Sequence, residues 1–192
     1  MKKLLLGTIL GGLVAFVWSM VSWEVLGWHE KSVRSFPNED AVTAVLTAPG
    51  VASGVYLFPG GPPHEGMTAE QVKAADEAVI ERMQKGPIMF AAVRSGGFKS
   101  FPLALGTQLA GLMTAAFLLT WLLLQTTGLS YAKRVVFLGV AGLAAGVIVE
   151  IPNWNWWGFS TAYTAVNIID FTLMWTIAGL VIARVARPEP RS

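Results

Sequence analysis

The sequence has no cysteine among its 192 residues, and its only histidines are His29 and His64. Without thiols the chain has no disulfide, no thiolate metal centre, no attached c-type haem and no dithiol redox chemistry. The stretch HEKSV at 29–33 begins like the zinc-protease motif H-E-x-x-H, but Val33 stands where the second histidine belongs. No Gly-rich phosphate loop, nucleophile elbow or paired-carboxylate spacing is evident. We therefore predict no catalytic residue, no metal and no cofactor, and we favour a non-enzymatic protein.

Charge is also scarce. Charged residues make up 14% of the chain, against about 25% in a soluble domain. The deficit is concentrated in four apolar stretches, and about 20 apolar residues are enough to cross a bilayer. Four buried helices of a soluble core would be the other explanation, but 192 residues cannot enclose them. We predict four membrane spans, from the stretches 4–25, 103–125, 135–151 and 159–183.

Lysine and arginine are distributed unevenly around these stretches. The two terminal flanks and the short loop after the second stretch hold seven basic residues and one acid, whereas 26–102 holds seven basic residues and eight acids. Because basic residues of short flanks stay in the cytoplasm, we predict cytoplasmic termini and an outer segment at 26–102. The pI near 9.0 then reflects topology, and no nucleic-acid binding is predicted. The seven basic residues are Lys2, Lys3, Lys133, Arg134, Arg184, Arg187 and Arg191.

The N-terminus resembles a secretory signal, because MKK precedes the apolar run LLLGTILGGLVAFV. The bulky, aromatic stretch VWSMVSWEVLGWHE follows, without a small-x-small cleavage site. We therefore expect an uncleaved first span whose helix continues beyond the membrane, since nothing interrupts it before Pro37.

The outer segment contains its own folding signals. Asn38 can cap a short helix, Thr68 and Gln71 form a T-x-x-Q capping box, and 54–58 and 87–94 are typical of strands. The predicted fold class is a mainly α membrane protein, a bundle of four transmembrane helices with a small extracytoplasmic α+β cap between helices 1 and 2. The predicted parts are helix 1 at 1–27, the cap at 28–101, helix 2 at 102–126, a cytoplasmic loop at 127–134, helix 3 at 135–151, a Trp-rich turn at 152–158, helix 4 at 159–183 and a tail at 184–192.

Tryptophans gather at the predicted outer face. Trp rings prefer the headgroup level, so an ordinary aromatic belt would explain them. A stacking platform for a ligand from the outside or the outer leaflet is the alternative. The candidate ligand or interface site comprises Trp23, Trp28, His29, Glu150, Trp154, Trp156 and Trp157.

Asp170 is the most informative residue of the last span. It lies roughly 16 Å from Phe159 along the helix axis and a similar distance from Arg184. Asp170 is therefore expected near the membrane midplane. Asn167 and Tyr163 share its helical face. A charge at this depth normally faces inward and has a partner, but no predicted span contains a basic residue or histidine.

The partner of Asp170 is therefore open. A protonated Asp170 could donate to Thr114 or Gln108 of the second span, as a structural hydrogen bond. An ionised Asp170 could instead pair with a basic residue of another protein or with a transported cation. Glu150 is expected at the outer interface.

Small-xxx-small pairs occur at Gly7/Gly11 and Gly142/Gly146. Such pairs let helices approach closely. We expect them to pack within the bundle, and homodimerisation is a further option.

The stretches SWEVLGWHEKSVRSF (22–36), GVYLFP (54–59) and NWWGF (155–159) resemble a pattern of small uncharacterised bacterial four-span inner-membrane proteins. The resemblance implies an inner-membrane topology and carries no activity. We predict an accessory or scaffold subunit in contact with the lipid bilayer and with a membrane-protein partner or a second copy. It would bind a lipid or another apolar molecule under a Trp-lined cap. The alternative is a proton- or ion-coupled carrier, or a membrane enzyme, that uses Asp170 on an amphipathic small molecule.

Overall fold

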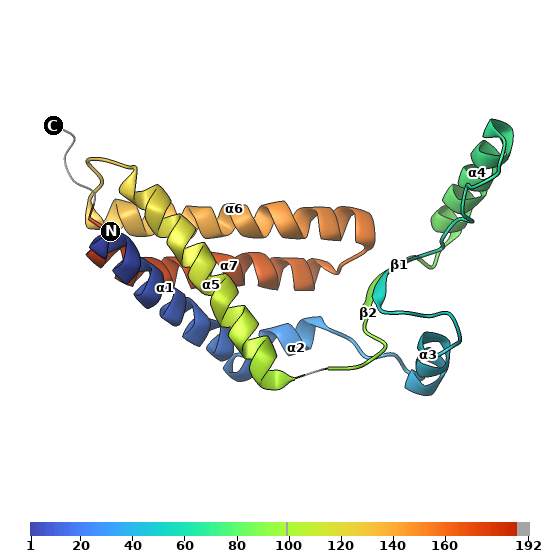
Figure 1. Ribbon diagram of the computed structural model, residues 1–192, viewed down its shortest axis with the longest axis horizontal. Helices are drawn as coiled ribbons and strands as arrows, with labels where there is room; N and C mark the ends of the chain where they lie inside the picture. Colours follow the sequence, from blue (N-terminus) through green and yellow to red (C-terminus); the bar gives the residue numbers. More distant parts are fainter. Residues whose placement is uncertain (99, 188–192) are drawn as a thin grey trace. The chain divides into compact units, whose positions relative to one another are not determined.

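The computed structural model describes residues 1–98 and 100–187, and it is mainly helical. Four helices are long and apolar enough to cross a membrane (Figure 1). The first is helix α1 (Lys2–Met20), which continues into the π-helix η1 (Val21–Val25). The others are α5 (Phe101–Leu124), α6 (Tyr131–Trp157) and α7 (Thr161–Val185). These four helices agree with the predicted spans, and a transmembrane protein is compatible with them.

The chain divides into two compact units. The long-helix unit contains residues 1–34, 100–154 and those from 159 onward, so it also includes helix α2 (Trp28–Ser32). The small unit contains residues 35–99 and 155–158.

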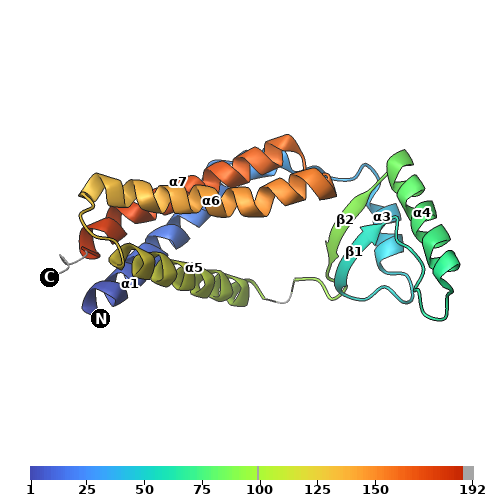
Figure 2. The ribbon, with the colours of Figure 1, turned by 90° about the horizontal axis from the view of Figure 1, so that it is seen from above.

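The long-helix unit is held together by closely approaching helices. A Cβ on Gly7 would lie 2.5 Å from Cγ2 of Thr120 in α5, and one on Gly142 would lie 2.5 Å from the carbonyl oxygen of Phe171 in α7. Gly11 and Gly146 meet Ile182 and Ile168 in the same way. The prediction that both glycine pairs pack within the chain is confirmed. Helix α5 diverges from α6 and α7 toward its N-terminal end (Figures 1 and 2).

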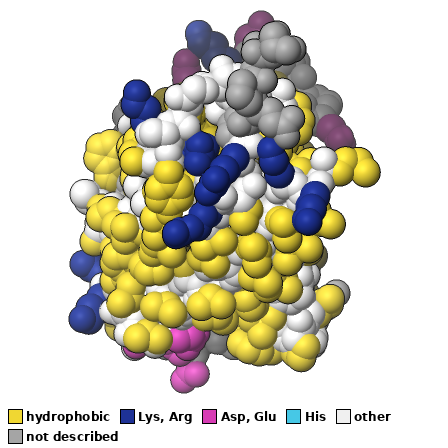
Figure 3. All heavy atoms as spheres, turned by 90° about the vertical axis from the view of Figure 1, so that its left-hand side faces the viewer, with side chains coloured by type: hydrophobic (Ala, Val, Ile, Leu, Met, Phe, Trp, Pro, Cys, Tyr) yellow, Lys and Arg dark blue, Asp and Glu magenta, His cyan; other side chains and the backbone are white. Residues whose placement is uncertain are grey.

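The core of this unit is small, because the helices keep large apolar side chains on their outer surfaces. Only 22–39% of the residues in the four apolar windows are buried. Figure 3 shows hydrophobic side chains over one flank and Lys and Arg side chains gathered beside it. At this end Lys3 Nζ donates to the carbonyl oxygen of Arg187, 3.0 Å away, so α1 and α7 end together. An apolar exterior with a basic end is the pattern expected of membrane helices.

The small unit contains two helices and one sheet. They are α3 (Glu39–Leu46), β1 (Gly54–Phe58), α4 (Ala69–Lys85) and β2 (Met89–Val93). The strands pair antiparallel, with Gly54 opposite Val93 and Phe58 opposite Met89. The predicted caps are confirmed: Asn38 accepts from the amide of Ala41, and Thr68 and Gln71 form the reciprocal capping box.

Two predicted boundaries are wrong at the end of the first span. The helix does not continue to Pro37, because Gly27 adopts φ 62° and turns the chain. Residues 28–34 then belong to the long-helix unit, so the small unit begins at residue 35 instead of 28.

The predicted Trp-rich turn at 152–158 is also wrong, since α6 continues through Pro152 to Trp157. Proline removes one helical hydrogen bond, and the bonds around it can keep the helix intact. Helix α7 extends to Val185, beyond the predicted end of the last span, and residues 188–192 of the predicted tail lie outside the described residues.

Candidate functional site

Asp170 is the centre of a buried polar network in the long-helix unit. It is 6% exposed. Trp18 Nε1 donates to Oδ1 at 2.7 Å, and Ser22 Oγ donates to the same oxygen at 2.8 Å. His29 Nε2 lies 3.3 Å from Oδ2. Both carboxylate oxygens therefore have partners, and all of these partners come from the first 34 residues.

The local backbone brings these partners together. Trp18 lies in the last turn of α1, which ends at Met20, and Ser22 lies in the π-helix that follows. A π-helix is rare and occurs often at functional sites. The left-handed conformation of Gly27 then reverses the chain, and the short helix α2 returns His29 to the side of Ser22. Glycine suits this turn because positive φ carries no steric cost without a Cβ.

Aromatic rings enclose His29, which is fully buried. The Trp23 ring stacks on the imidazole, with ring centroids 4.2 Å apart and an interplanar angle of 3°. The Trp28 ring meets it edge-on at 5.8 Å, and Trp28 Nε1 donates to Ser22 Oγ at 2.9 Å. Two of the predicted tryptophans therefore shield the histidine and complete the hydrogen bonds around it.

The hydrogen bonds indicate where the protons lie. The Ser22 hydroxyl gives its one proton to Asp170 and accepts from Trp28, so its oxygen faces His29 as an acceptor. The second neighbour of His29 Nε2 is a carboxylate oxygen. Nε2 therefore carries a proton. The other ring nitrogen, Nδ1, is buried without a hydrogen-bond partner among the described residues.

The predicted partners of Asp170 on the second span are wrong. Thr114 Oγ1 donates to the carbonyl of Ala110 in its own helix, and Gln108 is exposed. Their helix, α5, packs on α1 through contacts such as Gly7 with Thr120, whereas the face of α7 that carries Asp170 meets α1.

The neighbours of Asp170 on its own helix contact other groups as well and not the carboxylate. Asn167 Nδ2 donates to the carbonyl of Tyr163 and does not contact the carboxylate. The Tyr163 ring lies 5.3 Å from that of Phe159. The shared helical face was predicted correctly, but it does not make a polar site of three residues.

The remaining predicted tryptophans have separate roles. Trp154 Nε1 donates to Thr161 Oγ1 at 3.2 Å and links the end of α6 to the start of α7. Trp156 is 69% exposed. In the small unit, Trp157 stacks on Phe90 with centroids 4.8 Å apart. A single platform of five rings stays a prediction.

Glu150 is buried within the long-helix unit, with 6% exposure. Its expected depth at the outer membrane interface stays a prediction. Glu150 continues the row of Gly139, Gly142 and Gly146, which faces α7, and this register places it opposite Thr164. Oε2 of Glu150 and Oγ1 of Thr164 are both buried and have no hydrogen-bond partner among the described residues.

Sequence reasoning missed Trp18 and Ser22. A signal was present in the small residues Gly7, Gly11 and Ala15, which follow one face of α1 and are all buried. Continued by one more turn and across the π-helix, this face reaches Ser22. The glycines of this α1 face were predicted to pack against other helices, but the polar residue Ser22 at the C-terminal end of the same face was not predicted to be buried.

None of the five best-defined hollows in the described part of the chain is lined by Asp170 or His29. The largest measures about 830 Å³ and lies in the small unit, between α3 and β2. In the described ranges, no three His, Asp or Glu side chains gather as a metal site would require.

Comparison with protein families, with curated proteins and with solved structures finds no match to this chain. The resemblance to small inner-membrane proteins therefore stays a prediction, and the function must be argued from the geometry.

Proposed function

We propose that the chain is a multi-pass protein of the bacterial inner membrane that serves as a non-enzymatic accessory or scaffold subunit. Both termini would lie in the cytoplasm and the small unit in the periplasm. The four long apolar helices and the basic end of the long-helix unit support this placement.

The closed network around Asp170 carries the functional argument. A carboxylate on an ion or proton pathway must exchange its ligand, and such residues normally face a water-filled cavity. Here both oxygens have partners in Trp18, Ser22 and His29, and Asp170 lines none of the five best-defined hollows of the described residues. This arrangement supports a structural connection between the first and last long helices, which suits a scaffold better than a carrier.

The variant Asp170→Asn separates the two functions. In a scaffold, the amide oxygen still accepts from Trp18 and Ser22, so assembly is retained with a modest loss of stability. A proton- or cation-coupled carrier would lose transport while inserting normally. Retained partner capture by Asp170→Asn supports the scaffold, and uptake or efflux that disappears in this variant overturns it.

The partner can be sought directly. A tagged chain extracted in mild detergent should elute with a second protein, or a second copy, in a fixed ratio, and the ratio should be unchanged in Asp170→Asn. A chain that remains monomeric after extraction and after cross-linking in native membranes would contradict the scaffold role.

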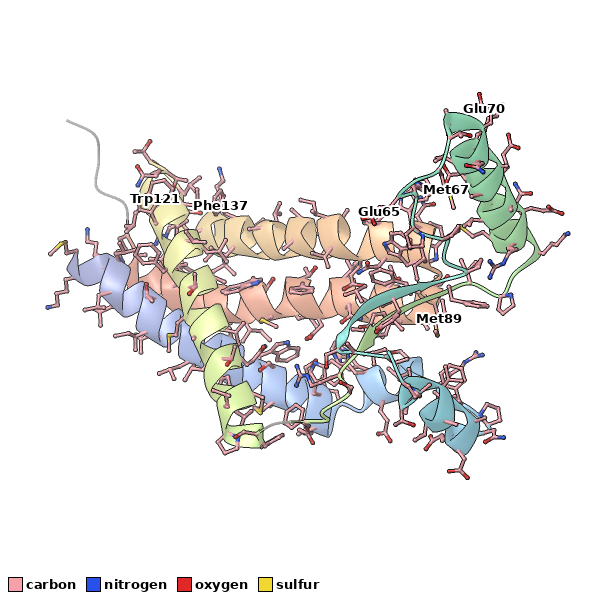
Figure 4. All side chains as sticks on the ribbon, turned by 45° about the vertical axis from the view of Figure 1, so that its right-hand side comes forward. Glu65, Met67, Glu70, Met89, Trp121 and Phe137 are labelled. Carbon is pink, nitrogen blue, oxygen red and sulfur yellow. The ribbon has the colours of Figure 1, made fainter. Side chains whose placement is uncertain are left out.

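The orientation of the chain in the membrane can be tested by thiol labelling. The chain has no cysteine of its own, so only an introduced thiol can react. The variants Glu65→Cys and Ser192→Cys each introduce one thiol, and Glu65 lies in an exposed loop of the small unit (Figure 4). An impermeant maleimide added to intact cells should label the first variant and not the second. Labelling of both from the same side would refute the four-span topology.

A further inference from the structure

The large hollow of the small unit has the features of a ligand site. Its volume, about 830 Å³, lies within the range of roughly 300–1,000 Å³ of small-molecule pockets. Apolar residues of α3, among them Val42, Val45 and Leu46, form one side. Strand β2 forms the other side. Such a lining suits a flexible hydrocarbon chain rather than a polar metabolite.

The pleat of β2 explains the second wall. Side chains alternate between the two faces of a strand, so Met89, Ala91 and Val93 share one face, and all three line the hollow, which Ala92 also borders. Phe90 points to the opposite face, where it stacks on Trp157. Met89 is labelled on the strand in Figure 4. The small side chain of Ala91 leaves room at the middle of this wall.

One end of the hollow is cationic. Arg94 directly follows β2 and lines the hollow together with Ser95, and no lining residue is acidic. Among the described residues no carboxylate forms an ion pair with Arg94. Its guanidinium carbon lies 6.0 Å from the centre of the Phe98 ring. A guanidinium is well suited to a carboxylate or phosphate, which it can bind through two parallel hydrogen bonds.

The neighbouring turn is fixed by its own hydrogen bonds. Ser53 and Ser95 hydroxyl oxygens lie 3.0 Å apart, and the Ser95 amide donates to Ser53 Oγ at 3.1 Å. These bonds connect the start of β1 to the residue after Arg94. The cation is therefore attached to an ordered part of the sheet edge.

We propose that this hollow binds a single-chain anionic amphiphile, with its acyl chain between α3 and β2 and its head group at Arg94. The positive charge of Arg94 at one end of the hollow favours this ligand over a neutral apolar molecule. The proposal goes beyond the scaffold role, and it depends neither on Asp170 nor on a partner subunit.

The test uses the full chain in nanodiscs of zwitterionic lipid. The probes are 16-carbon chains with a terminal diazirine, one with a carboxylate head and one with an alcohol head. After irradiation, mass spectrometry of peptides locates the label. The carboxylate probe should label 41–46 and 89–95 strongly. Labelling of the long helices reports simple partitioning into the bilayer and serves as the internal reference.

The variant Arg94→Gln should reduce carboxylate-probe labelling of the hollow about tenfold relative to that reference, because it removes a hydrogen bond to a charged group. The alcohol probe should be unaffected. Arg82→Gln is the matched control, since Arg82 lies in α4 and does not line this hollow. Arg94→Glu should transfer the preference to a chain with an amine head, a result that loss of folding could not produce.

A substitution that fills the hollow with a larger side chain tests the binding site independently of charge. Ala91→Phe should reduce labelling by both probes. Equal labelling by the carboxylate and alcohol probes in the wild type, or no response to Arg94→Gln and Arg94→Glu, would overturn the proposal in favour of a neutral apolar ligand. Cross-links from 41–46 or 89–95 to a second copy of the chain, in place of the probe, would assign the surface to an interface.

Discussion

The two units use burial in opposite ways. The long-helix unit buries Asp170, His29 and Glu150 together with rows of glycine. In the small unit, Pro59 alone is buried among the described residues, and neither α3 nor α4 has a buried side chain. Specific interior contacts therefore determine the first unit. Local caps, turns and one pair of strands determine the second, and two strands alone are marginal in water.

This comparison predicts that single substitutions in the long-helix unit have large, cooperative effects. Asp170→Ala would leave the Trp18, Ser22 and His29 groups buried without their acceptor. Each buried donor left without a partner costs about 1–3 kcal/mol, so losing an acceptor shared by three donors should lower the free energy of unfolding by at least about 3 kcal/mol. Denaturation by SDS in mixed micelles, followed by tryptophan fluorescence, measures it.

Two variants control this prediction. Asp170→Asn keeps an acceptor at Oδ1 and should lose clearly less stability. Asp76→Ala removes an exposed carboxylate paired with His64 in the small unit and should have little effect. Equal losses in Asp170→Ala and Asp76→Ala would contradict the difference between the units.

A second substitution tests the helix packing. Gly142→Ala would place a Cβ 2.5 Å from the carbonyl oxygen of Phe171 and 2.9 Å from Cβ of Trp175. Helices α6 and α7 must then separate, and overpacking of this kind costs about 1–3 kcal/mol. The same micelle titration measures the loss.

The matched control for this packing is Gly111→Ala in α5, where nothing lies within 4 Å of the new Cβ. Alanine is the better helix former by about 1 kcal/mol, so Gly111→Ala should be neutral or stabilising. A destabilised Gly111→Ala, or a neutral Gly142→Ala, would show that the close approach of α6 and α7 is not what holds this unit together.

Substitutions in the small unit should have local effects. Thr68→Ala removes the side chain that caps α4 through the amide of Gln71. Loss of such a cap costs about 1 kcal/mol. Hydrogen exchange should accelerate in the first turn of α4 and remain unchanged in α1 and α7. Faster exchange in the long helices would mean that the units unfold together.

The smallest expected effect is a pH dependence at the same cap. Hydrogen bonds to its own backbone amide and to Thr68 lower the pKa of Glu70 below its ordinary value. A lowered pKa in the folded state stabilises α4 above the unfolded pKa, and this contribution disappears as the pH falls through the folded pKa. The protection of the first turn, measured against the intrinsic exchange rate at each pH, should therefore fall in mild acid, and Glu70→Gln should remove that dependence.

Features that depend on neighbours in sequence were predictable. The four long helices follow from apolar run length, and the α3 and α4 caps follow from Asn38 and from the T-x-x-Q spacing. Asp170 was correctly placed on a buried face, because the cost of an intramembrane charge requires it to face inward.

The partners of Asp170 were not predictable in this way. Ser22 is 148 positions distant in sequence, and the order of helices along the chain does not indicate which of them pack together. Nothing in VSWEV indicates a π-helix. Gly27 alone could have suggested that the chain turns back and returns His29 to the C-terminal end of α1.

The polar network connects the first and the last of the four long helices. Trp18, Ser22 and His29 leave the ribosome long before Asp170 is translated. Until Asp170 is present, these three groups have no carboxylate to bind. The network can therefore close only after the first and the last long helices are both in place, so a chain truncated before Asp170 cannot form it.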